Sequence, residues 1–258
     1  MCTSGQNEKT LVSVIMPAYN VSQFVKEAIM SVLEQTMTNW ELIVIDDCSK
    51  DNTVEIVQQL AEKDSRIRLI KNDINMMVSK TRNRGIEISQ GKYIAFLDSD
   101  DYWKPNFLER MISCIEETNA DIVYCSYELV GEQGQKVCND FIVPLSTTFD
   151  EAIVRSAITC STVLMKCDIA KDNPFPTNVY HEDITLWFTL LRDGKIARGE
   201  QMVLASYRQR SGSRSSDKIR NAIKRWVVYR KHLKLPFFKS VFTMIKYAYF
   251  GILKFKRI

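Results

Sequence analysis

Residues 91–101 read GKYIAFLDSDD, a short apolar run that is followed at once by three carboxylates. The run is nearly continuous in apolar character, as a strand that is covered on both faces must be. Four further segments share this character and are rich in Val and Ile. We predict strands at 92–97 and at 11–16, 41–45, 67–70 and 121–125.

The segments between these strands have helical patterns. We predict helices at about 22–36, 52–64, 78–89 and 105–118, the first with one apolar face formed by Val25, Ala28, Ile29, Val32 and Leu33. Short strands that alternate with helices and short connections are typical of an α/β fold. The sequence therefore predicts a doubly wound, mostly parallel, Rossmann-like sheet.

The second half is less regular. Gly and Pro interrupt residues 126–180, where we expect a hairpin, irregular loops and a helix near 150–158. A helix at about 182–192 and a β-like stretch at 196–207 follow. The last 41 residues are expected to be helical, with a break near Pro236.

Composition excludes a disordered chain, a collagen and a disulfide-rich miniprotein. Of the 258 residues, 45% are hydrophobic and 26% are charged, which is ordinary for a globular protein. Two His residues cannot build a multi-histidine metal centre, so the chemistry must rest largely on carboxylates. Seven Cys without a C-x-x-C pair indicate reduced thiols in a cytosolic protein. The polar start of the chain does not favour secretion. The chain also lacks an apolar run long enough to indicate a spanning helix.

Charge is divided unevenly along the chain. Residues 1–217 hold 23 Lys and Arg against 31 Asp and Glu, whereas residues 218–258 hold 12 Lys and Arg and no acid. In this basic tail Phe238, Phe242, Ile245, Tyr249 and Ile252 recur at helical spacing, and Lys239 and Lys246 lie on another face. The pattern favours an anionic membrane surface over a helix packed on the domain with a solvated basic face. No motif for nucleic acid is present.

Polar residues follow three of the predicted strands: 17–20, Asp46-Asp47 and 98–101. In a doubly wound sheet, ligands bind outside the carboxyl ends of the strands, so these groups should share one edge. Asp98 and Asp100 would repel each other there, and a hard divalent cation such as Mg²⁺ or Mn²⁺ removes that repulsion. The alternative is an acidic surface turn that caps the next helix.

Three further groups each allow two interpretations. Asp46 and Asp47 either accept hydrogen bonds from a ribose or base, or cap the helix that starts near residue 52. The basic positions 82–84 either bind a diphosphate or form a solvated helix face. Glu182 and Asp183 open a helix and complement its dipole, but a buried Asp183 could also be a general base, because Trp187 would help to desolvate it and raise its pKa.

Five motifs occur in a fixed order: VSVIMPAYN, ELIVIDDCSKDNT, TRNRGIE, GKYIAFLDSDD and HEDITLW. Together they resemble a family-2 glycosyltransferase of the GT-A fold over roughly residues 11–215. The resemblance implies a catalytic domain at 1–217, with a nucleotide-sugar half at about 10–125 and an acceptor half at about 126–217. Residues 218–258 would form the basic amphipathic tail.

The resemblance also implies roles for individual residues. The nucleotide's base and ribose would be lined by Pro17, Tyr19 and Asp47, with Asn20 and Asp46 nearby. The donor diphosphate would be held through Mn²⁺ or Mg²⁺ by Asp98 and Asp100, with Asp101 close and Arg82 near the diphosphate or Asp98. Asp183 would be the catalytic base.

Two positions depart from the pattern of the family. Met76-Met77 stands where many members have Gly-Gly, which puts the path of that loop in question. Arg210 stands where many members have a His, and it either clamps phosphate oxygens of the donor or belongs to a basic loop.

By the same resemblance, the expected activity is transfer of a hexose, with inversion, from a nucleotide sugar, and the expected nucleotide is UDP. The expected acceptor is a saccharide on a polyprenyl diphosphate. The expected pathway is the synthesis of a surface polysaccharide, such as capsule or the O-antigen of lipopolysaccharide. The enzyme would be cytoplasmic and peripheral on the inner face of the cell membrane. The alternatives are a metal-dependent sugar nucleotidyltransferase, whose Gly-rich phosphate loop is missing after Met16, and a non-catalytic membrane adaptor.

Overall fold

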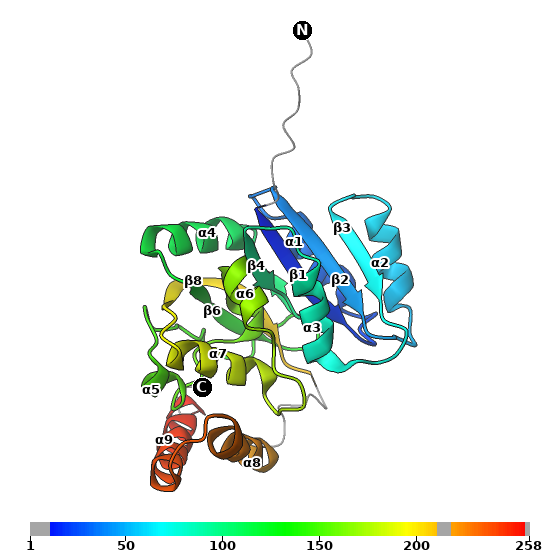
Figure 1. The fold of residues 1–258 in the computed structure, drawn as a ribbon. Helices are drawn as coiled ribbons and strands as arrows, with labels where there is room; N and C mark the ends of the chain where they lie inside the picture. Colours follow the sequence, from blue (N-terminus) through cyan, green and yellow to red (C-terminus); the bar gives the residue numbers. More distant parts are fainter. Residues whose placement is uncertain (1–10, 211–217, 256–258) are drawn as a thin grey trace.

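The computed structural model describes residues 11–210 and 218–255, and one mixed sheet runs through its centre (Figure 1). Its strands are β1 (Val12–Ala18), β2 (Trp40–Asp46), β3 (Ile67–Lys71), β4 (Tyr93–Phe96), β5 (Tyr102–Trp103), β6 (Ile122–Val130), β7 (Val163–Lys166) and β8 (Ala197–Arg208). Their order in the sheet is β3-β2-β1-β4-β7-β6-β8-β5. All five predicted strands and the β-like stretch are therefore present.

The pairing of these strands divides the sheet. β3, β2, β1 and β4 are parallel, as predicted, and β6 pairs with β8 in parallel. β7 joins the two groups by running antiparallel to both β4 and β6, and β5 pairs antiparallel with β8. Neither β5 nor β7 was predicted: β5 has only two residues, and β7 lies in the stretch at 126–180 that Gly and Pro interrupt.

The helices mostly lie where the sequence places them. They are α1 (Val25–Leu33), α2 (Thr53–Ala61), α3 (Met77–Glu87), α4 (Phe107–Thr118), α5 (Phe149–Ala152), α6 (Cys167–Asp172), α7 (Glu182–Arg192), α8 (Lys218–Val227) and α9 (Phe237–Phe255). The predicted helix near 150–158 is wrong in extent, because α5 ends at Ala152. A capping box at Thr148 stabilises the start of this single helical turn. The expected break near Pro236 is confirmed, since α9 begins at the next residue.

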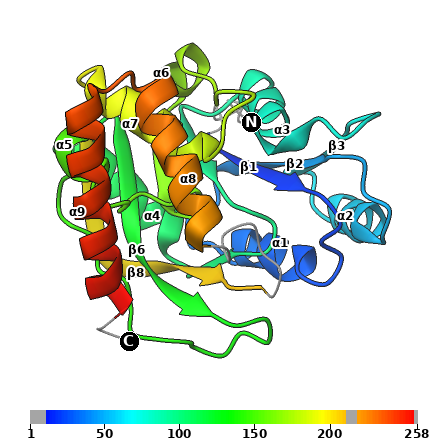
Figure 2. The ribbon, with the colours of Figure 1, turned by 90° about the horizontal axis from the view of Figure 1, so that it is seen from below.

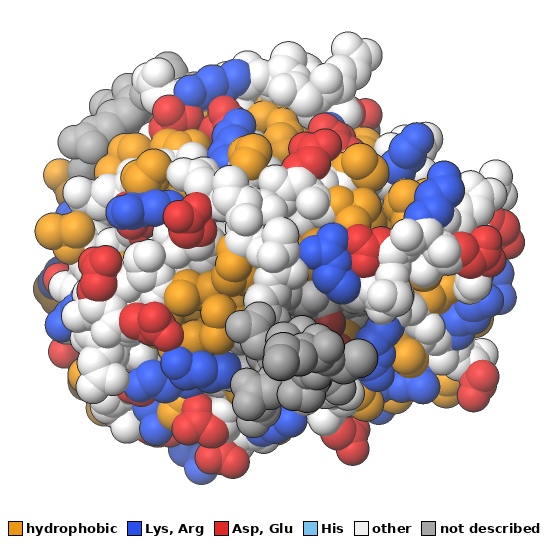
Figure 3. Space-filling model, turned by 90° about the horizontal axis from the view of Figure 1, so that it is seen from above, with side chains coloured by type: hydrophobic (Ala, Val, Ile, Leu, Met, Phe, Trp, Pro, Cys, Tyr) orange, Lys and Arg blue, Asp and Glu red, His pale blue; other side chains and the backbone are white. Residues whose placement is uncertain are grey.

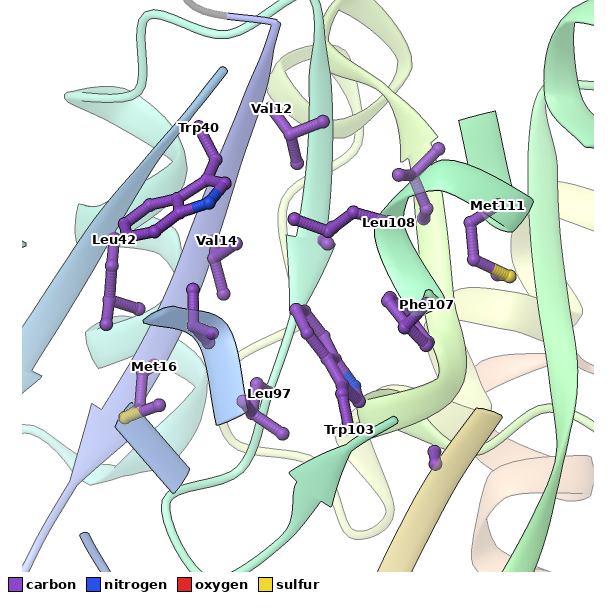
Figure 4. Close-up of a cluster of buried hydrophobic side chains, with 14 of the residues drawn as sticks. Val12, Val14, Met16, Trp40, Leu42, Leu97, Trp103, Phe107, Leu108 and Met111 are labelled. Carbon is purple, nitrogen blue, oxygen red and sulfur yellow. The ribbon is translucent and has the colours of Figure 1, made fainter. Parts of the chain in front are cut away.

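Strand β1 shows why its sequence is apolar at all positions but Ser13. Val14 and Met16 face a core that is covered by α1 and α4 (Figure 4), whereas Ile15 faces the opposite core beneath α3 and α7. Successive side chains of a strand alternate between the faces, so a sheet with helices on both sides favours apolar residues on both. Ser13 is buried too, and its hydroxyl donates to Glu41 Oε1 of β2 at 2.6 Å. Figure 2 shows α3 on one side of β1–β3, with α1 and α2 on the other.

The first part of the basic tail packs on the domain. Four of its residues belong to the core on the α7 side of the sheet: Val228 and Tyr229, which lie in a π-helical turn after α8, and Leu233 and Leu235. No helix within the described ranges combines the length and the apolar character that crossing a bilayer requires. One sheet spans both proposed halves of the catalytic domain, and the domain limits themselves stay a prediction.

Candidate active site

The three polar groups that follow β1, β2 and β4 meet at one edge of the sheet. These strands are neighbours and run parallel, so their carboxyl ends lie side by side. In Figure 1 the arrowheads of β1 and β3 point down and to the right, toward this edge. The predicted grouping is therefore present.

The turn at 98–101 is fixed by its last residue. Asp101 is buried, and its carboxylate accepts hydrogen bonds from the Ser161 hydroxyl at 2.5 Å and from the Arg208 backbone N–H at 2.8 Å. Ser161 Oγ also accepts the N–H of Asp98 at 3.1 Å. Burial and the charges of Asp100 and Asp98 raise the pKa of Asp101 well above its ordinary value. Asp101 thus anchors the turn instead of facing a ligand.

Asp98 and Asp100 lie at the rim of this turn, with side chains 30% and 20% exposed. Burial, followed by the charge of Asp98, raises the pKa of Asp100, and the Arg210 guanidinium opposes the effect. Arg210 Nε lies 2.8 Å from Asp100 Oδ2. The structure therefore brings Arg210 to the acidic turn, where it neutralises one of the two carboxylates.

This pair has the chemistry of a partial cation site. Two accessible carboxylates, of which Asp98 raises the pKa of Asp100, fit a hard cation, which takes one or two carboxylates and completes its shell with phosphate oxygens and water. Across 11–210 and 218–255, no cluster of three or more His, Cys, Asp or Glu side chains is arranged to hold a metal. A cation held by Asp98 and Asp100 would therefore need further ligands, such as phosphate oxygens and water.

Arg82 lies beneath the acidic turn. Its guanidinium is almost completely buried and donates from Nη2 to Asp98 Oδ1 at 2.5 Å and from Nη1 to Glu182 Oε1 at 3.4 Å. Burial alone would lower the pKa of Arg82, but the charges of Asp98 and other nearby acids raise it. Arg82 therefore keeps its charge and links the end of β4 to the first turn of α7.

A glycine lets α3 bring Arg82 this close. A Cβ at Gly85 would lie 2.6 Å from Ile15 Cγ2 and 2.8 Å from Ile45 Cδ1, so only a residue without a side chain fits there. The other two basic-helix positions have different contacts. Asn83 bonds the backbone of Phe175 in both directions, and Arg84 donates to the Lys71 carbonyl at 2.9 Å. Of the three predicted diphosphate contacts, only Arg82 reaches the acidic turn.

Asp183 occupies the first turn of α7, next to this network. Burial first, and then the charge of Glu182, raise its pKa to about 6, while the Arg82 guanidinium and the N–H of Ile184 oppose the rise. The mutual influence of Asp183, Asp98 and Arg82 places the three in one electrostatic cluster. A carboxyl with this pKa is mostly ionised at neutral pH and can accept a proton.

Asp47 holds the loop that was in question. Its Oδ1 accepts from Asn72 Nδ2 and from the Met76 N–H, both at 2.8 Å, and its Oδ2 accepts from the Met77 N–H at 2.9 Å. The carboxylate thus fixes the start of α3, where Met77 has a positive φ of 69°. Asp47 caps α3 in this structure, and not the helix near residue 52 that the sequence suggested.

The remaining donor candidates surround Asp47. Asp46 Oδ2 accepts the Ser49 N–H at 3.1 Å, and in the described part of the chain its buried Oδ1 has no hydrogen-bond partner. Asn20 binds the neighbouring loop, because its N–H donates to Ser49 Oγ at 3.0 Å and its side chain accepts the N–H of Lys50 at 2.7 Å. Tyr19 is exposed and Pro17 is half-buried at the same edge.

Sequence reasoning missed two residues that organise the site. Ser161 and Arg208 hold Asp101, and Arg208 also donates from Nε to the Asp100 carbonyl at 2.9 Å. Ser161 lies in a short 3-10 turn without a recognisable pattern. Arg208 ends a strand that could be predicted, but its partners lie more than a hundred residues earlier in the chain, so no local signal marks it.

Comparisons with known proteins agree with this geometry. The family model described as Glycosyl transferase family 2 matches residues 13–136. The chain is 36% identical over 242 residues to the putative teichuronic acid biosynthesis glycosyltransferase TuaG of Bacillus subtilis, covering 94% of this chain and 96% of TuaG. It is 34% identical over 245 residues to the UDP-Glc:alpha-D-GlcNAc-diphosphoundecaprenol beta-1,3-glucosyltransferase WfgD of Escherichia coli, covering 95% of this chain and 94% of WfgD.

The fold is also that of a solved structure. Staphylococcus aureus TarS, residues 1–349 in complex with UDP-GlcNAc, superposes with a TM-score of 0.72 at 21% identity, covering 92% of this chain and 71% of that one. The mixed sheet and its order of elements are those of the GT-A fold. The near full-length similarity to two family members, and the family motifs at this edge of the sheet, show that the chain belongs to glycosyltransferase family 2.

Proposed function

We propose that this glycosyltransferase moves a hexose from a UDP-sugar to a saccharide carried on a polyprenyl diphosphate, in one metal-assisted displacement that inverts the anomeric centre. One observation carries the proposal: a buried guanidinium, Arg82, joins the acidic rim at Asp98 to the helix turn that bears Asp183. This arrangement supports a site in which Asp98 would belong to a phosphate-binding rim and Asp183 would accept a proton.

The donor side is assigned to the edge of β1, β2 and β4. Tyr19 and Pro17 offer surface for the base and ribose, and Asp46 Oδ1 is an acceptor that still lacks a donor. Asp98 and Asp100 would hold Mn²⁺ or Mg²⁺ against the diphosphate. When bound, such a cation neutralises charge that develops on the leaving nucleotide. Arg210 is suited to phosphate oxygens because its guanidinium lies against Asp100.

The chemical step is assigned to Asp183. Its ionised carboxylate takes the proton of the acceptor hydroxyl as the oxygen attacks the anomeric carbon from the face opposite the nucleotide. The bond from the anomeric carbon to the diphosphate oxygen breaks as the new glycosidic bond forms, so no covalent enzyme intermediate is required. Arg82 holds Glu182 and thereby the first turn of α7 in place.

The acceptor is inferred from relatives. WfgD, by its name, acts on GlcNAc linked to diphosphoundecaprenol, and the similarity to it extends over almost the whole of both chains. TuaG, by its name, belongs to the synthesis of another bacterial surface polymer. A lipid-linked acceptor in surface polysaccharide synthesis, met by a peripheral enzyme at the cytoplasmic side of the membrane, is consistent with both.

A donor panel tests the proposal. The full-length protein is incubated with Mn²⁺, a set of UDP- and GDP-sugars, and a short-chain polyprenyl-diphosphate GlcNAc. We expect one donor to yield UDP and a disaccharide lipid of inverted configuration, and EDTA to abolish both. Release of pyrophosphate would indicate a nucleotidyltransferase, and no turnover of any donor would contradict the assignment.

A further inference from the structure

Helix α9 packs on the domain with its polar side. Ser240 and Thr243 are buried, and their hydroxyls bond backbone carbonyls within their own helix. Met244 contacts the core on the same side, and the Tyr247 ring lies 4.7 Å from the buried guanidinium of Arg225. These positions lie on one side of the helix, so the inward face is settled by contacts.

The opposite side of α9 is apolar and exposed. Phe238, Phe242, Ile245 and Tyr249 are spaced four, three and four residues apart, which keeps them within about 60° of one another at 3.6 residues per turn. Each is between 58% and 85% exposed. A surface helix normally turns its apolar stripe inward. Here the order is reversed, which indicates an apolar partner outside the chain.

The flank of this stripe is cationic. Lys239 and Lys246 are exposed one heptad apart; the Lys239 ammonium lies 3.1 Å from Asp150 Oδ1 of α5, and the Lys246 ammonium lies 4.4 Å from the Phe242 ring centroid. Residues 218–258 contain no Asp or Glu, and Arg230 and Lys234 add exposed charge beside the helix. The far side of the molecule is different, because there Lys and Arg are interspersed with Asp and Glu (Figure 3).

We propose that the outward stripe of α9, formed by Phe238, Phe242, Ile245 and Tyr249, docks on an anionic lipid bilayer. Aromatic and aliphatic side chains along a helix that lies in the interface enter the boundary between headgroups and acyl chains, and a flanking row of Lys pairs with lipid phosphates. A protein partner would need an apolar groove that matches the stripe and acids opposite these Lys. A bilayer supplies an apolar interior and anionic phosphates along the full length of the stripe.

Docking on this stripe would orient the active site. The adjoining helix α8 lies against the start of α7: Lys224 Nζ is 5.3 Å from the Tyr180 ring, and Arg225 and Lys224, after burial, lower the pKa of His181. Both tail helices lie at the bottom of the molecule, below the sheet whose strands β1 and β3 point downward (Figure 1). This part of the inference rests on the proposed function, because it brings a lipid-linked acceptor to Asp183.

Vesicle sedimentation of the full-length protein tests the surface. The probes are phosphatidylcholine vesicles with and without phosphatidylglycerol. We expect binding that requires the anionic lipid and weakens with salt. A variant with Gln at all four stripe positions, Phe238→Gln, Phe242→Gln, Ile245→Gln and Tyr249→Gln, should bind at least about tenfold less, because Gln keeps helix propensity and removes only apolar surface.

A matched control replaces exposed apolar residues elsewhere: Val137→Gln, Ile142→Gln and Leu145→Gln. This variant should bind vesicles like the wild type. Equal binding of the stripe variant and the wild type would overturn the proposal. The proposal would also be overturned if the wild type were a dimer that does not bind vesicles and the stripe variant were a monomer. In that case a second copy of the chain would cover this face.

Activity separates this proposal from the proposed function. The stripe variant should turn over a water-soluble acceptor analogue at the wild-type rate and lose activity only on the lipid-linked acceptor in vesicles. If the wild type binds vesicles through the stripe but releases no nucleotide from any donor, the transferase assignment fails and the docking surface stands.

Discussion

Replacement of Asp183 by Asn should abolish transfer and at the same time make the protein more stable. The folded structure raises the pKa of Asp183 from its ordinary 3.8 to about 6. At about 1.4 kcal/mol per pH unit, ionising this group in the folded chain costs about 3 kcal/mol more than in the unfolded chain. The cost is the consequence of holding a proton acceptor in a buried, acidic setting.

The sign of this effect fixes its pH dependence. Because the folded pKa is raised, the protonated form favours the fold, and this contribution is present below about pH 4 and lost as the pH rises through 6. Linkage places about half of the loss by pH 5 and nearly all of it by pH 7. Asp183→Asn escapes the cost, so its free energy of unfolding should exceed that of the wild type by about 3 kcal/mol at pH 8 and by about half as much at pH 5.

Two assays measure this prediction. Urea unfolding at pH 5 and pH 8 gives the stability difference, and initial rates of UDP release with acceptor give activity, which should fall by about 10²–10⁴-fold. Donor affinity, measured by calorimetry, should change little. The control is Asp193→Asn at the other end of α7, where the carboxylate is exposed and pairs with Arg192. Transfer within about tenfold of the wild type, or a stability difference that does not vary with pH, would refute the assignment.

Three further predictions follow from the same site. The wild-type kcat/KM should fall about tenfold per pH unit below about pH 6 as Asp183 gains its proton, and a profile flat to pH 5 would contradict this. Ser161→Ala removes a hydroxyl that donates to buried Asp101 and should lower the free energy of unfolding by about 1–3 kcal/mol in urea titrations. The neutral control is Ser113→Ala, at a half-buried position whose hydroxyl donates to the Glu109 carbonyl within α4. Gly85→Ala forces a Cβ against Ile15 and should lower the free energy of unfolding by about 1–3 kcal/mol. Activity should fall as well if α3 moves outward and carries the Arg82 guanidinium with it. Unchanged stability would contradict this prediction, because it would mean that the strand side chains move aside without cost.

The parts of the fold that sequence could predict are those with local signals. The runs that became β1, β2 and β4 are apolar at most positions because helices cover both faces, and this pattern, together with the helices between the runs, indicated a parallel sheet with a polar edge. β7 was missed because its short apolar run lies in the irregular stretch at 126–180, although it is the strand that turns the sheet from parallel to mixed.

The candidate site divides in the same way. Asp98 and Asp100 could be placed from their position after an apolar strand, but the contrasting role of Asp101 could not. It depends on Ser161 and Arg208, which lie 60 and 107 residues away in the sequence. Likewise, the engagement of Asp47 by the Met76 and Met77 amides follows from the path of a loop and not from the motif itself.

One buried cation connects the chemistry to the tail. The Arg225 guanidinium of α8 donates to Ser156 Oγ at 2.8 Å and lies 4.8 Å from the Phe188 ring of α7 and 4.7 Å from the Tyr247 ring of α9. A buried guanidinium that is satisfied by hydroxyls, carbonyls and aromatic faces tolerates little displacement, because any shift leaves a desolvated charge unpaired. The helix that bears Asp183 and the helix that presents the exposed stripe are therefore held on the same group. A bilayer that fixes α9 would fix the orientation of α7, and the proton acceptor would meet the lipid-linked hydroxyl at a defined height above the membrane.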